Sequence, residues 1–309
     1  MVSIIVKHKR RMIQKYTTKK KPKSCLNREI VINHEKLYCK NIYKKLAVIN
    51  ITKKEYALVN LPANATIQFI KANVNSMHFS SINSIEKNST NTRYLRMLCD
   101  IVCFDYSLLS STTLISLQNE LETIESSYYK GMLAEEVIRN ILKSRIRHLK
   151  YTGNIPHCAD FMSLLYLVEI KNHKKEKSNE ILKFCFDMIY QYRKTKKYRF
   201  GLFIHLFKNK DYYIIDEKTG KITNSNSFDK FPYVPFLGIP FVELYKIDEI
   251  LCKISSYLEN FTWKSRYEQI FFLAKKYNTK DKLQAENARL KAENTRLKEL
   301  LTLHNIPFS

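Results

Sequence analysis

Two charged residues in one apolar run of the chain have types and spacing suited to metal-assisted chemistry. In Tyr166–Lys171, which reads Tyr-Leu-Val-Glu-Ile-Lys, the side chains of an extended strand alternate, so Glu169 and Lys171 share a face. A strand this apolar is normally buried, where a charged pair is costly unless it meets a partner or a metal ion. The pair is therefore a candidate functional site, with a structural ion pair as the alternative.

A further carboxylate lies nearby in the sequence. Asp160 precedes Glu169 by nine residues, in a short segment that could pair with the strand as a hairpin and bring its carboxylate beside Glu169. Two carboxylates and a nearby backbone carbonyl form a hard-oxygen site, which suits Mg²⁺ or Mn²⁺ together with water and a substrate phosphate. The sequence thus predicts a divalent metal held by Asp160 and Glu169.

These residues belong to a longer ordered pattern. Its members are, in chain order, Gly131, Glu135, Asp160, Glu169, Lys171 and Gln191. Their order and spacing resemble the PD-(D/E)XK nuclease superfamily, particularly its lambda-exonuclease-like and Holliday-junction-resolvase-like branches, over residues 128–207. One departure is that Ala159 stands directly before Asp160, where the family pattern has proline.

The resemblance implies an α/β fold with a restriction-endonuclease-like core, a mixed sheet flanked by helices. It also implies that Asp160 and Glu169 hold Mg²⁺ or Mn²⁺, while Lys171 orients or activates the attacking water and stabilises the developing phosphate charge. By the same resemblance Glu135 completes the metal site from the preceding helix, and Gln191 supports the site from the following helix.

The helix expected at 133–147 offers two adjacent acids, Glu135 and Glu136. At about 100° per residue, Glu135 lies on the edge of the apolar stripe and Glu136 points well away from it. We therefore assign Glu135 to the site. The alternative is that both are solvated acids favoured by the helix dipole.

The elements that position these residues are expected in one compact region, because all five glycines fall between residues 131 and 238. The prolines of 228–241 indicate an ordered linker. Upstream, short apolar runs over 45–71 predict a small sheet, and 95–121 is predicted to be largely helical. The expected domains are a basic arm (1–44), an accessory α+β domain (45–125), the nuclease-like core (126–240), a helical extension (241–279) and a leucine-zipper coiled coil (280–304).

The net charge predicts a polyanionic partner. The chain has 53 Lys+Arg and 29 Asp+Glu, which gives a formal charge of +24. This excess favours nucleic acid as the partner, and we expect DNA. The alternatives are an anionic membrane surface and a basic surface without a specific partner. The cations expected to neutralise phosphates are Arg145, Arg147, Lys150, Lys174, Lys175, Arg193, Lys194, Lys196 and Lys197. His157 and His173 bracket the site and are either phosphate contacts or idle surface residues.

Residues 1–50 contain 14 Lys/Arg and two Asp/Glu. Within them, Lys19, Lys20, Lys21 and Lys23 resemble a single-cluster nuclear import signal, and the alternative is a solvated basic arm that contacts phosphates. Seven scattered cysteines without a C-x-x-C pair indicate reduced thiols, and no apolar run of about 18 residues occurs. We expect a soluble intracellular protein that does not enter a membrane.

The C-terminal segment contains two near-identical heptads that predict a parallel homodimer. Leucines occupy the d positions and asparagines the a positions, which favours two parallel strands in register, and Glu at g can pair with Lys at e of a partner. The residues assigned to dimerisation are Leu283, Asn287, Leu290, Asn294 and Leu297.

Together these features predict a dimeric, Mg²⁺-dependent nuclease that acts on DNA in recombination, repair or replication. A catalytically inactive, dimeric nucleic-acid-binding scaffold and an RNA endonuclease are the alternatives. Endonuclease and exonuclease action are both compatible with the sequence.

Overall fold

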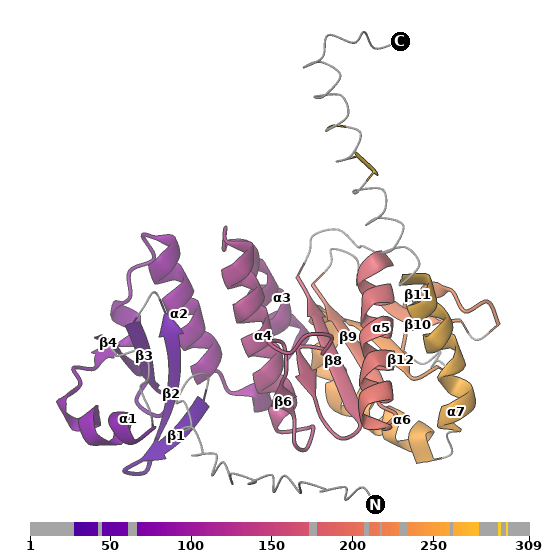
Figure 1. Ribbon diagram of the computed structural model, residues 1–309. Helices are drawn as coiled ribbons and strands as arrows, with labels where there is room; N and C mark the ends of the chain where they lie inside the picture. Colours follow the sequence, from indigo (N-terminus) through magenta and orange to yellow (C-terminus); the bar gives the residue numbers. More distant parts are fainter. Residues whose placement is uncertain are drawn as a thin grey trace, which may run out of the picture. The chain divides into compact units, whose positions relative to one another are not determined.

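A computed structural model describes residues 28–42, 45–60, 67–172, 178–206, 210–216, 218–228, 234–259, 262–277, 290–291 and 295. Within these residues the chain is a mixed α/β protein with two β-sheets, and it divides into two compact units, Met1–Ile85 and Glu86–Ser309 (Figure 1). The expected α/β class is confirmed at this level.

The first unit is an antiparallel meander in which each described strand pairs with the next. Isoleucine, leucine and valine side chains from β1, β2 and β3 form its core together with Ile70 of the helix α1. Its strands are β1 (Arg28–Ile32), β2 (Glu35–Ile42), β3 (Lys45–Asn50), β4 (Glu55–Asn60) and β5 (Ser80–Ser81), and its helices are α1 (Ile67–Asn73), η1 (Val74–Ser76) and η2 (Ile82–Ser84).

The small sheet predicted over 45–71 is present as β3 and β4, but its last part, from Ile67, is the helix α1, and the sheet begins earlier than expected. Strands β1 and β2 lie inside the predicted basic arm 1–44 because alternating apolar residues between the charges give this stretch a buried face. The part of the predicted arm before residue 28, including the lysines of the possible import signal, lies outside the described residues.

The second unit is built on a mixed sheet with the described strand order β11-β10-β12-β9-β8-β7-β6. The neighbours β8, β9 and β12 are parallel, and the remaining pairs are antiparallel. The strands are β6 (Lys150–Tyr151), β7 (Phe161–Met162), β8 (Tyr166–Lys171), β9 (Phe200–His205), β10 (Tyr212–Ile215), β11 (Ile222–Ser225) and β12 (Phe236–Pro240).

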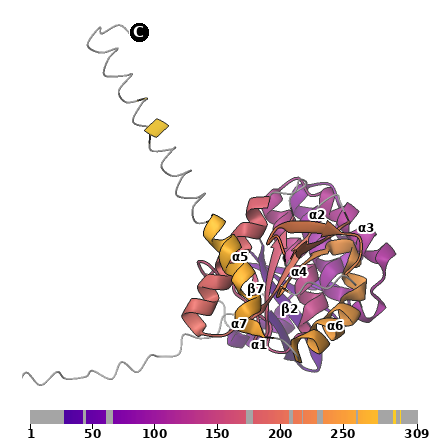
Figure 2. The ribbon, with the colours of Figure 1, turned by 90° about the vertical axis from the view of Figure 1, so that its right-hand side faces the viewer.

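Helices cover both faces of this sheet (Figures 1 and 2), with α5 and α7 on one side and α3 and α4 on the other. Since both faces are covered, the parallel strands are almost continuously buried and apolar. The helices are α2 (Thr90–Cys103), η3 (Tyr106–Leu108), α3 (Ser111–Glu122), α4 (Ser127–Lys143), α5 (Ser178–Thr195), η4 (Phe241–Lys246), α6 (Ile247–Glu259) and α7 (Trp263–Arg266). Residues 268–277 are also helical.

Two expectations about the second unit were wrong. The predicted linker 228–241 contains β12, a buried strand that pairs with β9 on one side and β10 on the other. Its prolines misled the prediction because Pro240 ends the strand and does not interrupt it. Helices α2 and α3, expected within an accessory domain ending at 125, belong to the second unit, which begins at Glu86.

Of the residues assigned to the zipper, Leu290 is described and is 45% exposed. Leu283, Asn287, Asn294 and Leu297 lie outside the described residues, so the coiled coil remains a prediction. In the part of the chain that the structure describes, no helix has both the length and the apolar character needed to cross a membrane.

Candidate active site

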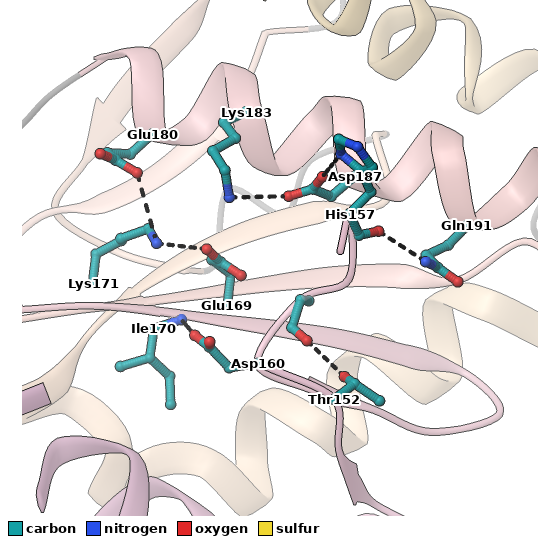
Figure 3. Close-up of polar contacts among 11 residues, drawn as sticks. Thr152, His157, Asp160, Glu169, Ile170, Lys171, Glu180, Lys183, Asp187 and Gln191 are labelled. Carbon is teal, nitrogen blue, oxygen red and sulfur yellow. Dashed lines mark hydrogen bonds and ion pairs between the residues drawn. The ribbon is translucent and has the colours of Figure 1, made fainter. Parts of the chain in front are cut away.

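Strand β8 carries Glu169 and Lys171 to its carboxyl end. Leu167, two residues before Glu169, packs in the core cluster formed with α5, so strand alternation turns Glu169 and Lys171 toward α5 as well. Glu169 is 3% exposed, and its Oε1 lies 2.6 Å from Nζ of Lys171. The same ammonium lies 3.6 Å from Oε2 of Glu180 on α5 (Figure 3). The predicted strand and shared face are confirmed.

Asp160 lies opposite Glu169, as the predicted hairpin requires. Strands β7 and β8 are antiparallel with Phe161 opposite Val168, and one further step in this register pairs Asp160 with Glu169. Oδ2 of Asp160 accepts a hydrogen bond from the backbone N–H of Ile170 at 2.8 Å (Figure 3). This bond holds the carboxylate at the edge of β8.

The carboxylates perturb one another. Burial, followed by the charges of Glu169 and Glu135, raises the pKa of Asp160 from 3.8 to about 8, against the opposing effects of the Ile170 N–H and Lys171. Burial by itself would lower the pKa of Lys171, but the charge and hydrogen bond of Glu169, together with the charges of Asp160 and Glu180, outweigh burial and raise this pKa to about 12. The site therefore favours a bound proton or another positive charge.

Glu135 reaches this site from α4. The helix begins with Ser126 as its N-cap, whose side chain accepts from the N–H of Tyr129. One turn before Glu135, a Cβ built on Gly131 would lie 3.2 Å from Nδ2 of Asn172, which follows β8 directly. The absent side chain at Gly131 thus allows α4 to approach the end of β8.

The assignment of Glu135, and not Glu136, to the site is supported because the charge of Glu135 helps to raise the pKa of Asp160. Glu135 also hydrogen-bonds to the hydroxyl of Tyr151, whose pKa is raised by burial and then by this carboxylate. The alternative that both acids are solvated was wrong for Glu136. Glu136 is 4% exposed and pairs with Arg139, because α4 packs against β8 and also against α2 and α3.

The donor set has the hard oxygens that Mg²⁺ or Mn²⁺ prefers. Among the described residues, however, no group of three or more His, Cys, Asp or Glu side chains is arranged as a metal-binding cluster. The hydrogen bond from Ile170 uses Oδ2 of Asp160, and the ion pair with Lys171 uses Oε1 of Glu169. Each carboxylate therefore has a second oxygen to offer a cation, and the raised pKa of Asp160 fits a place where positive charge is needed.

Gln191 supports the segment that leads into Asp160. Its Nε2 donates to the backbone carbonyl of His157 at 2.8 Å, and its side chain is buried on α5. Nδ1 of His157 lies 3.7 Å from Oδ1 of Asp187, which is 1% exposed and also pairs with Lys183 at 3.3 Å. Gln191 therefore holds the backbone of His157, and Asp187 lies beside its ring, three residues before Asp160 (Figure 3).

The predicted phosphate-binding cations differ in their surroundings. Arg145 bonds to Asp248 at 2.8 Å and to the carbonyl of Ile141, so it joins α4 to α6. His173, Lys174 and Lys175 lie outside the described residues. The exposed members of the set are Arg147, Lys150, Arg193, Lys194, Lys196 and Lys197.

Three residues of the site were not predicted. Glu180 was missed because its contact with Lys171 depends on how α5 packs beside β8, although its place in the first turn of a helix is a detectable signal. Tyr151 had no sequence signal, because its contact with Glu135 depends on the fold. Asp187 could have been noticed as an acid on the apolar face of α5, where its neighbours Phe184 and Met188 are buried.

The comparisons with known proteins give no relative for this site. No protein-family model matches the chain, and no curated protein and no solved structure is detectably similar to it.

Proposed function

We propose that the chain is a metal-dependent nuclease that hydrolyses phosphodiester bonds of DNA, with a core of the restriction-endonuclease-like kind. The observation that carries the proposal is that Asp160, directly before β7, lies within electrostatic reach of Glu169 on β8 and is bonded to the N–H of Ile170, with Lys171 paired to Glu169. Glu135 adds a third acid within electrostatic reach. An inactive scaffold has no need for charges gathered at this cost in a poorly solvated place.

In the proposed mechanism Asp160 and Glu169 would hold the cation, with Glu135 of α4 as a third acid. A bound Mg²⁺ or Mn²⁺ would supply Lewis-acid stabilisation of the phosphate and a nucleophile at neutral pH. The Lys171 ammonium orients the attacking water and stabilises the charge that develops on the phosphate oxygens. Glu180 gives this ammonium a second carboxylate partner, so Lys171 stays charged and in place.

The exposed cations around the site would bind the backbone of the substrate without reading its sequence. The zipper would join two copies of the chain as a parallel homodimer. Recombination, repair and replication are the processes that need such an enzyme on DNA. Cleavage of RNA is the second candidate, because the same metal chemistry serves both polymers.

A nuclease assay on single-stranded DNA, duplex DNA and RNA, with and without Mg²⁺, tests the proposal. Asp160→Asn and Glu169→Gln should each lower turnover by at least about a hundredfold, while affinity measured in EDTA changes only a few fold. Asp100→Asn, which alters an acid paired with Arg96 on α2, is the matched control and should keep full activity. Unchanged turnover in both site variants would refute the assignment.

A further inference from the structure

An aromatic groove lies between the second half of α5 and the helical residues 268–277. It has a volume of about 310 Å³. We define it by Phe186, Tyr190 and Arg193 on α5, and by Phe271, Phe272 and Lys275 on the facing helix. These rings and cations alternate on the surface of the same unit that holds the carboxylates.

The groove presents open ring surfaces. Tyr190 is 39% exposed and Phe272 is 48% exposed, so both rings are accessible to a ligand. Nζ of Lys276 stacks 4.5 Å from the centre of the Phe272 ring, and the guanidinium of Arg193 stacks 6.0 Å from that of Phe271. Cations held over aromatic rings are also close to any anion that approaches those rings.

The groove continues toward the carboxylate site. The ring of His157 lies 4.8 Å from that of Tyr190 and 5.7 Å from that of Phe186. The backbone of His157 is held by Gln191 and leads directly to Asp160. Along α5, ten residues separate Glu180, beside Lys171, from Tyr190, which corresponds to about 15 Å at the rise of an α-helix. A bound chain molecule could therefore contact both places.

The charge of the groove selects an anionic occupant. Among the described residues, its lining includes Arg193 and Lys275 and no acidic side chain. The nearest acid on α5, Asp187, is buried and already faces His157 and Lys183. Flat rings interleaved with cations are the features by which proteins bind single strands, because unpaired bases expose ring faces for stacking. In a duplex these faces are already stacked on neighbouring bases.

We propose that the aromatic groove binds single-stranded nucleic acid and leads the strand toward Asp160, Glu169 and Lys171. This inference rests on the proposed function, since it names the form of substrate that the carboxylate site receives. Strand binding is nevertheless measurable without cleavage, so the two proposals can fail separately.

Fluorescence anisotropy of a labelled single-stranded oligonucleotide and of the matching blunt duplex, in EDTA with the full chain, tests the inference. Tyr190→Leu and Phe272→Leu remove the ring and keep apolar bulk, and each should weaken single-strand binding at least about fivefold while duplex binding changes less than about twofold. Phe272→Trp should preserve or strengthen single-strand binding. Tyr245→Leu is the matched control, because Tyr245 is also an exposed ring stacked with a lysine, Lys246 at 5.2 Å, outside the groove.

Equal losses for single strand and duplex would overturn the inference, because the groove would then be only part of a cationic surface. Unchanged binding in folded leucine variants, checked by their Tm, would overturn it as well. A change only in oligomeric state would show that a protein segment fills the groove. If single-strand binding depends on the groove but no substrate is cleaved with Mg²⁺, the nuclease proposal fails and the groove assignment stands.

Discussion

At the scale of single residues, the site places four charged side chains in a small, poorly solvated volume. They are Glu135, Asp160, Glu169 and Lys171. Lys171 neutralises Glu169 at 2.6 Å, whereas among the described residues Asp160 accepts its hydrogen bond from the backbone N–H of Ile170. Burial and the neighbouring carboxylates raise the pKa of Asp160 to about 8. A bound cation would relieve this imbalance, which is the physical link between the geometry and the proposed metal.

Variants of Lys171 distinguish the proposed enzyme from a catalytically inactive scaffold. If its ammonium supports the attacking water, Lys171→Ala should lower turnover by about a hundredfold or more with little change in affinity. Lys171→Arg keeps the charge but replaces a compact ammonium with a planar fork, so turnover should remain low. Single-turnover kinetics at saturating DNA measure the effect. Full activity of the arginine variant would favour the scaffold.

Asp160 should also make the stability of the metal-free protein depend on pH. Between the ordinary pKa of 3.8 and the raised value of about 8, the unfolded chain loses the proton that the folded chain keeps. The folded state is therefore favoured at low pH and loses this advantage as pH rises to about 8.

Asp160→Asn cannot ionise, so in EDTA the gap between its Tm and that of the wild type should be clearly larger at pH 9 than at pH 5, where the wild type has lost only the first part of this advantage. A difference of a few °C corresponds to about 1 kcal/mol for a unit of this size. Thermal melts at both pH values measure the gap, and Mn²⁺ should narrow it at pH 9. An equal gap at both pH values would contradict the assigned ionisation.

At the scale of elements, the site exists because three segments meet at the carboxyl end of β8. Strand β7 brings Asp160, α4 brings Glu135, and α5 brings Glu180 and Gln191. The approach of α4 is set at Gly131, where the backbone comes close to Asn172. Nδ2 of Asn172 in turn lies 3.4 Å from the carbonyl oxygen of Ser127, to which it donates.

A larger side chain at Gly131 should displace α4 from β8. Gly131→Ala adds only a methyl group, which Asn172 can accommodate by moving slightly, and it improves helix propensity by about 1 kcal/mol. Gly131→Leu should shift Glu135 and lower turnover about tenfold or more, since small misplacements at a site are costly. Turnover and Tm of both variants check this, with the alanine variant as control. Normal turnover of the leucine variant would show that this approach does not matter.

At the scale of the whole molecule, the chain is strongly basic, with a formal charge of +24, and it divides into two compact units. The carboxylates, the aromatic groove and the helices that hold them all belong to Glu86–Ser309. Under the proposed function, this positive charge would attract nucleic acid of any sequence, and the buried acids at β8 would carry out the chemistry.

The predicted zipper should determine the oligomeric state. Deleting residues 280–309 should convert a dimer to a monomer in light scattering, as should Leu290→Lys combined with Leu297→Lys, because both remove the d-position contacts. Ala285→Lys with Ala292→Lys, at outward heptad positions, is the matched control and should stay dimeric. A truncated protein that remains dimeric at micromolar concentration would assign the main interface elsewhere.

The sequence by itself determined the local part of this site. The alternation of Tyr166–Lys171 predicted β8 with its actual bounds, and the shared face of Glu169 and Lys171 followed from the strand period. The short segment around Asp160 was predicted to pair with this strand, and the register confirms it. These features depend on neighbours only a few residues away, whose geometry the backbone imposes.

Only the tertiary structure decided which distant elements meet these residues. The burial of Glu136, the contact of Tyr151 with Glu135 and the place of β12 between β9 and β10 all depend on packing between segments far apart in the sequence. Periodicity describes one side of an element, but α4 is covered on several sides. Proline content likewise cannot show whether a short apolar run is a linker or a strand of the sheet, because that depends on the strands beside it.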